Sequence, residues 1–194
     1  KHMYTELLEK GYACLRRSDP HGALVRFQNA IDMEPERPQG YFALAQAYLE
    51  QGLGDETCSA LEKALNIDPT YVVARAYLAI ELVKKYDLDG AQRELDQALL
   101  DEPANLLVHI KYAEYYYRLG FYPRSVELLE QGLKGPHGAN EHVVAMARQF
   151  LTQAREKSRN LILREPPDPR RLVTFFSRLR PQKKPFISQS TQSS

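Results

Sequence analysis

Few residues in this chain have the types and spacing that chemistry requires. His137 and His142 flank Glu141, a donor set that a metal ion could use, but they fall in a predicted turn and helix start, where solvated side chains are the ordinary outcome. Cys14 and Cys58 lack metal-binding or redox spacing, and we interpret them as buried free thiols. Phosphate-binding loops and nucleophile motifs are absent from the sequence. We therefore predict a non-enzymatic protein with no catalytic residue, metal, cofactor or small-molecule substrate.

Aromatic and basic side chains gather in two places that could contact a nucleic acid. The aromatic run has offsets that match helix core positions, so we predict packing rather than base stacking for Tyr112, Tyr115, Tyr116, Tyr117, Phe121 and Tyr122. Residues 164–194 hold seven basic and two acidic side chains, whereas the remainder holds 19 basic and 23 acidic ones. One basic stretch is weak evidence for nucleic-acid binding, so we do not expect a nucleic-acid partner.

A fixed period organises the first 139 residues. Pro35, Pro69 and Pro103 lie 34 residues apart, and each ends an apolar run with helical periodicity, because proline cannot continue a helix. Repetition at this period indicates stacked repeats. The apolar runs and the turns between them predict helices over residues 4–17, 20–33, 38–51, 54–67, 72–85, 88–101, 106–119 and 122–134, and a longer helix over 140–164.

Residue types also recur at fixed offsets within each 34-residue unit. The eighth position is always small: Gly11, Ala45, Ala79 and Ala113. The twenty-fourth position is large and apolar: Phe27, Leu61, Leu95 and Leu129. The twenty-seventh position is small again: Ala30, Ala64, Ala98 and Gly132. Small residues let two helices approach closely, and the large residue fills the space between neighbouring units.

This pattern resembles the tetratricopeptide repeat (TPR) family over residues 4–139. The resemblance implies an all-α fold, a right-handed α-solenoid of four helix–turn–helix units over 4–37, 38–71, 72–105 and 106–139. The chain departs from the family pattern at position 20, where Thr57 and Ser125 replace alanine, and at the end of the fourth unit, where His137 replaces the proline. We predict that residues 140–164 form a capping helix on the last unit.

In TPR arrays the first helix of each unit lines a concave groove, which implies a protein or peptide ligand. Carried onto this chain, the groove positions are Leu8, Tyr12, Leu15, Gln39, Phe42, Gln46, Leu49, Val73, Ala76, Ile80, Val83, Leu107, Ile110, Glu114 and Tyr117. This set is mainly apolar, so we expect an apolar or amphipathic segment to cover it, although the twist of the array can also bury single members between units.

Some TPR modules hold the acidic C-terminal tails of chaperones in a clamp of polar and basic side chains. The corresponding residues here are Leu8, Tyr12, Ala43, Val73 and Tyr77. None of these side chains can hold a carboxylate, so we do not expect a chaperone tail to be bound in that way.

The segment after the capping helix has its own composition. Residues 165–194 predict a proline-rich linker, a short basic amphipathic helix over about 169–180, and a Ser/Gln-rich tail. Leu172, Phe175, Phe176 and Leu179 recur at helical spacing, which makes this helix a candidate ligand for the groove of its own or a neighbouring chain, the latter by self-association. Two alternatives stay open: contact with an anionic membrane surface, as in a peripheral assembly factor, and a disordered end.

The chain start and the apolar runs bear on location. Residues 1–3 have the character of a cloning remnant, so a preceding signal or anchor can have been removed. No apolar run reaches the ~18 residues that a membrane-spanning helix needs. Together with two unpaired cysteines, these features favour the cytoplasm as the expected location.

Overall fold

A computed structural model describes residues 2–160 of the protein. All regular secondary structure in that range is helical, in nine α-helices: α1 (His2–Arg16), α2 (Pro20–Met33), α3 (Pro38–Glu50), α4 (Gly54–Ile67), α5 (Val72–Lys84), α6 (Leu88–Asp101), α7 (Leu106–Arg118), α8 (Tyr122–Lys134) and α9 (Glu141–Arg159). The first eight begin and end within two residues of the predicted ranges. In α9 the helix ends at Arg159 and Asn160 follows in a turn, and the last part of the predicted 140–164 helix lies outside the described residues.

A side-chain cap at the start of the second helix is present in alternate units. Asp19 and Asp87 cap α2 and α6, each accepting a hydrogen bond from a glycine N–H three residues later. At the equivalent positions before α4 and α8, Leu53 and Phe121 offer no side-chain cap. The first and third units therefore resemble each other, and so do the second and fourth.

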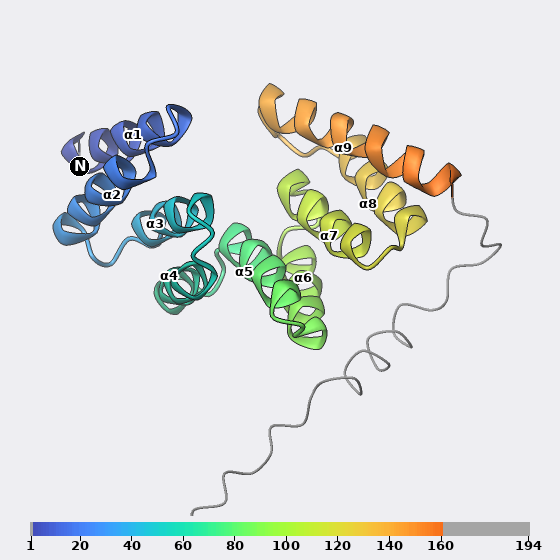
Figure 1. Cartoon of the computed structure of the whole chain (residues 1–194), viewed down its shortest axis with the longest axis horizontal. Helices are drawn as coiled ribbons and strands as arrows, with labels where there is room; N and C mark the ends of the chain where they lie inside the picture. The colour runs from blue at the N-terminus through green and yellow to red at the C-terminus, as the bar shows by residue number, and fades with distance from the viewer. Residues whose placement is uncertain (1, 161–194) are drawn as a thin grey trace, which may run out of the picture.

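The helices form an arc that is open on one side (Figure 1). The first helices of the four units, α1, α3, α5 and α7, lie along its inner face, and the second helices, α2, α4, α6 and α8, lie outside them. Helix α9 packs on α8 and also reaches α7, so it covers the end of the last unit. This arrangement is the all-α solenoid with a capping helix that the sequence predicts.

The core is divided into two apolar clusters that meet on α5. The first joins the helices of units one and two and includes Ala74 and Leu78 of α5. The second joins units three and four to α9 and includes Ala76 and Ile80, from other faces of α5. Helix α5 therefore contributes to both clusters and holds the two halves of the array together.

Candidate peptide-binding groove

The predicted groove residues fall into three groups by burial. Phe42, Ala76, Ile80 and Ile110 are buried and belong to the two core clusters. Gln39 is exposed. The other ten are half-buried along the inner helices: Leu8, Tyr12, Leu15, Gln46, Leu49, Val73, Val83, Leu107, Glu114 and Tyr117. Most of the predicted set therefore stays partly accessible on helices that line the concave face.

The part of the groove formed by α1, α3 and α5 is aromatic and uncharged. The ring of Phe42 lies 5.3 Å from that of Tyr77 and 5.4 Å from that of Tyr71, and the ring of Tyr12 lies 5.1 Å from that of Phe27. Burial raises the pKa of Tyr71 to about 12 and raises the pKa of Tyr12 further, so both phenols are neutral at physiological pH. Ala43, at a chaperone-clamp position, is fully buried and has an uncharged side chain.

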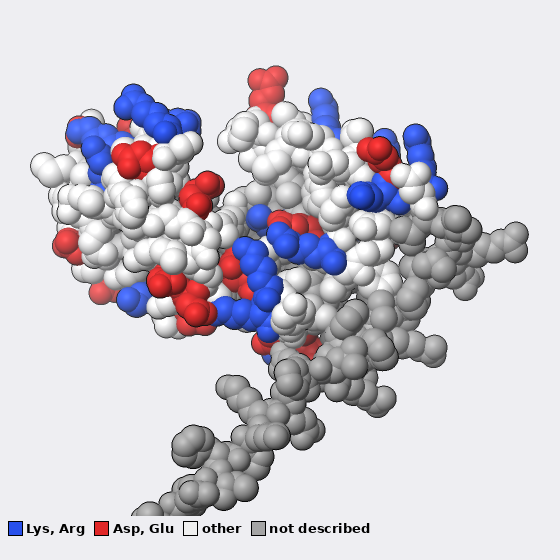
Figure 2. Space-filling view, viewed as in Figure 1, with Lys and Arg blue, Asp and Glu red and all other residues white. Residues whose placement is uncertain are grey.

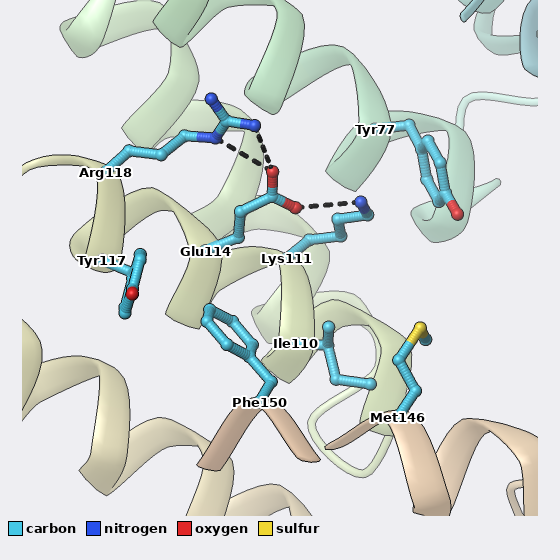
Figure 3. Close-up of a pocket in the computed structure, with 8 residues that line it drawn as sticks. All are labelled: Tyr77, Ile110, Lys111, Glu114, Tyr117, Arg118, Met146 and Phe150. Carbon is cyan, nitrogen blue, oxygen red and sulfur yellow. Dashed lines mark hydrogen bonds and ion pairs between the residues drawn. The ribbon is translucent and has the colours of Figure 1, made fainter. Parts of the chain in front are cut away.

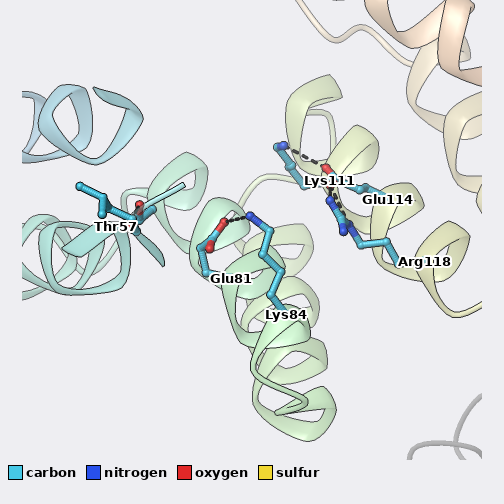
Figure 4. A network of polar contacts seen from close by, with 7 residues as sticks. Thr57, Glu81, Lys84, Lys111, Glu114 and Arg118 are labelled. Atoms are coloured by element: carbon cyan, nitrogen blue, oxygen red, sulfur yellow. Dashed lines mark hydrogen bonds and ion pairs between the residues drawn. The ribbon is translucent and has the colours of Figure 1, made fainter. Parts of the chain in front are cut away.

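The floor of the groove over α5 and α7 carries charges. Figure 2 shows the molecule hollowed between the two ends of the arc, with mostly uncharged walls and basic and acidic groups gathered below them. Figure 4 shows an ion pair on α5, Glu81 with Lys84, and a charged cluster on α7, where Glu114 binds Lys111 and Arg118. Glu81 is only 3% exposed, whereas the α7 cluster reaches the groove surface.

A pocket of about 590 Å³ opens at the C-terminal end of the groove (Figure 3). Its lining residues come from α5, α7 and α9: Tyr77, Ile110, Lys111, Glu114, Tyr117, Arg118, Met146 and Phe150. The rings of Tyr117 and Phe150 meet edge to face at 5.3 Å, and the Lys111 ammonium lies 4.3 Å from the centre of the Tyr77 ring. The pocket thus has an apolar side formed with α9 and a charged side on α7.

Sequence reasoning found only part of this pocket. Ile110, Glu114 and Tyr117 are predicted groove residues, but Lys111 and Arg118 are not, and neither are the two residues from α9. The available signal was the spacing of Met146 and Phe150, which places both on one face of the capping helix.

The aromatic run and the His137 turn make ordinary packing and hydrogen-bond contacts. Tyr112, Tyr115, Tyr116 and Phe121 are buried, and their rings pack on one another, which confirms core packing for these members of the aromatic run. Nowhere between residues 2 and 160 do three or more His, Cys, Asp or Glu side chains gather to hold a metal ion. His137 instead accepts a hydrogen bond at Nδ1 from the Ala139 N–H.

Two further findings concern membrane-spanning helices and the C-terminal tail. None of the helices within the described range is both long and apolar enough to cross a bilayer. The candidate tail ligand, Leu172, Phe175, Phe176 and Leu179, lies outside the described residues, as does the rest of the 165–194 segment.

Comparison with known proteins agrees with the repeat geometry. Residues 8–72 match the family model for the tetratricopeptide repeat. Human tetratricopeptide repeat protein 34 is 35% identical over 100 residues, which are 50% of this chain and 18% of that protein. Superkiller protein 3 of Schizosaccharomyces pombe is 26% identical over 121 residues, 59% of this chain and 9% of that protein. The chain therefore spans less than a fifth of the length of these relatives.

Solved structures show the same fold at low sequence identity. The anaphase-promoting complex hetero-tetramer Cut9–Hcn1 has a TM-score of 0.67 with 16% identity, over 79% of this chain and 30% of that one. The first TPR domain of Spaghetti (RPAP3), bound to an HSP90 peptide, has a TM-score of 0.55 with 19% identity, over 61% of this chain and 94% of that one. The match over residues 8–72 and the two relatives support a protein of the tetratricopeptide repeat family, and the fold that it shares with the solved structures generally mediates protein–protein interaction.

Proposed function

We propose that this protein is a non-enzymatic scaffold or adaptor that binds an apolar or amphipathic peptide segment of a partner along its concave groove. The observation that carries the proposal is the half-buried apolar lining of the inner helices, from Leu8 on α1 to Tyr117 on α7. When an apolar segment covers half-accessible apolar side chains along one concave face, the free energy falls, because apolar surface is removed from water.

The chaperone-tail mode is not part of this proposal. The RPAP3 domain binds an HSP90 peptide, but the clamp positions of this chain are Leu8, Tyr12, Ala43, Val73 and Tyr77, without a cation among them. A carboxylate placed at Leu8, Tyr12 or Ala43 would lose its hydration without gaining a counter-charge, which is costly. The aromatic half of the groove therefore favours apolar side chains.

The chain's own C-terminal segment is a candidate occupant of the same groove. Its four apolar residues at helical spacing would give roughly 6–12 kcal/mol on full burial, as an upper bound. Ordering a helix of this length costs a comparable amount of conformational entropy. Docking of the tail is thus expected to be marginal, and a partner peptide could displace it.

The test is a selection of short random peptides on the immobilised full chain, followed by anisotropy titrations of the selected peptides. We expect Leu8→Glu, on α1 in the groove, to weaken binding at least about tenfold, because it places a charge on the apolar lining. The matched control is Leu100→Glu, since Leu100 is 73% exposed on the outer helix α6. Equal affinities of the two variants for every selected peptide would reject the groove as the binding site.

The tail is tested in the same titrations by Phe175→Ala with Phe176→Ala in the full chain. If the tail competes for the groove, removing its two aromatic rings raises the affinity for the selected peptides, because less of the groove is occupied. An unchanged affinity together with an unchanged oligomeric state contradicts the built-in ligand and leaves the groove proposal standing.

A further inference from the structure

We propose that the pocket between α7 and α9 is a subsite for an acidic segment of the partner: a large apolar side chain enters the pocket, and a neighbouring carboxylate pairs with Arg118 and Lys111. This inference rests on the proposed peptide-binding function and specifies the chemistry of the ligand. It concerns the C-terminal end of the groove and shares only Tyr77 with the clamp positions discussed above.

The apolar side of the pocket is suited to one large side chain. Ile110 and Tyr117 come from α7, and Met146 and Phe150 come from α9, so the two helices enclose the space between them (Figure 3). Met146 is 38% exposed although it is apolar, and it faces this space. A volume of about 590 Å³ accommodates a side chain together with adjoining backbone, within the range of ordinary ligand pockets.

The charged side of the pocket holds more positive than negative charge. Glu114 accepts hydrogen bonds from Lys111 Nζ at 3.0 Å and from Arg118 Nε and Nη2 at 2.9 and 2.7 Å. Burial by itself raises the pKa of Glu114, but the two cations outweigh it and hold that pKa below its usual value. Glu114 is therefore ionised at neutral pH and neutralises one of the two cations, which leaves the cluster with one net positive charge.

Glu114 also positions the two cations for a ligand. Both of its oxygens are used, so Lys111 and Arg118 are held along the pocket wall before anything binds (Figure 3). Arg118 is 41% exposed, and its Nη1 and the second hydrogen of Nη2 remain for an incoming carboxylate. A preorganised cation costs little further ordering on binding.

Charge also separates this subsite from the chain's own tail. The predicted helix over 169–180 contains Arg170, Arg171, Arg178 and Arg180 and no acidic residue. A basic segment against a net positive cluster is repelled, whereas an acidic one is attracted. The tail therefore fits the uncharged half of the groove better than this pocket.

The test uses the three methionines of the full chain, Met3, Met33 and Met146, labelled with ¹³C at their methyl groups. Three short capped peptides are titrated, each with one Phe in a Gly/Ser background followed by two Asp, two Asn or two Lys. We expect the Asp peptide to shift the Met146 methyl signal and to bind about tenfold more tightly than the Asn peptide. Met3 and Met33, on the N-terminal helices α1 and α2, serve as internal controls.

Two matched variants check the charge. Arg118→Gln should bring the Asp peptide to the affinity of the Asn peptide, whereas Arg124→Gln should not. Arg124 is 42% exposed and pairs with Glu127 on α8, so it matches Arg118 in exposure and pairing but lies outside the pocket. An unmoved Met146 signal, or equal shifts with all three peptides, would overturn the inference. Selected peptides that depend on Leu8 but leave Met146 unmoved would overturn it too, while the proposed function would survive.

Discussion

Gly11 on α1 and the ring of Phe27 on α2 fit together so closely that no other residue can replace the glycine without movement. A Cβ added at Gly11 would lie 2.3 Å from Phe27 Cε1 and 2.7 Å from Cδ1. Phe27 is fully buried, and in a close-packed core its ring moves only by displacing its neighbours. The other three units combine alanine at the eighth position with leucine at the twenty-fourth, so the smallest residue occurs where the largest partner occurs.

We predict that Gly11→Ala destabilises the protein by about 1–3 kcal/mol, because overpacking outweighs the helix propensity that alanine gains. Phe27→Leu alone creates a cavity and is destabilising too. The double variant Gly11→Ala with Phe27→Leu restores the pairing of the other units, so it should lose less stability than the two single changes added together. Urea unfolding of the four proteins measures this coupling, and additive losses would contradict the fit.

A second contact joins the two halves of the array. Glu81 on α5 places its Oε2 beside Gly54, the first residue of α4, where an added Cβ would lie in ordinary van der Waals contact with it at 3.4 Å. Leu53 gives α4 no side-chain cap, and Glu81 puts a buried carboxylate at this helix N-terminus. In the first two units the equivalent position holds Ala13 and Ala47, so this acidic residue is particular to the third unit.

We predict that Glu81→Ala lowers the free energy of unfolding by about 1–2 kcal/mol, because α4 loses the anion at its N-terminus and Lys84 loses its partner. Glu127→Ala is the control, since its ion pair with Arg124 is exposed on α8 and is expected to contribute about 0–1 kcal/mol. Thermal unfolding followed by circular dichroism measures both variants. If they were equally stable, the role of Glu81 at α4 would be rejected.

The sequence predicted the helices well because their signals are local. Turn residues and prolines, for example Asp19 and Pro20 at the start of α2, act within a few residues of the helix end that they define. The same local signals placed the four units and the start of the capping helix. Predicting such features does not require knowing which helices are in contact.

The pocket could not be predicted in the same way, because it depends on contacts between distant segments. Tyr77 and Phe150 line one pocket although they are far apart in sequence, and this requires knowing how α9 packs on α7. Gly132 is a similar case: an added Cβ would lie 2.8 Å from the Cβ of His109, so the glycine compensates for a histidine on another helix. The repeat pattern identifies such residues one at a time. Only the packed structure shows which two of them are in contact.

The reactivity of Cys58 should report on the packing of α4. Cys58 on α4 is 6% exposed, and burial raises the pKa of its thiol, although Lys85 opposes this effect. We predict that native Cys58 reacts with iodoacetamide at least about tenfold more slowly than in the unfolded chain, because both the exposed area and the thiolate fraction are small. Mass spectrometry of time points under native and denaturing conditions measures the two rates. Similar rates would contradict the packing of α4.

Glu114 should make the stability of the array depend on pH. Its pKa in the folded protein lies below the ordinary value of 4.5, because the charges of Lys111 and Arg118 outweigh the opposing effect of burial. A carboxylate with a lowered pKa stabilises the folded state above the unfolded pKa, and this stabilisation is lost as pH falls through the folded pKa.

Glu114→Gln is therefore expected to be less stable than the wild type by about 1 kcal/mol at neutral pH, with the difference shrinking below pH 4.5. Urea unfolding at a series of pH values measures this difference. Glu127→Gln is the control, because its carboxylate belongs to an exposed pair and should change little at any pH. A stability difference for Glu114→Gln that stayed constant from neutral to acidic pH would show that the ionised carboxylate does not hold the two cations together.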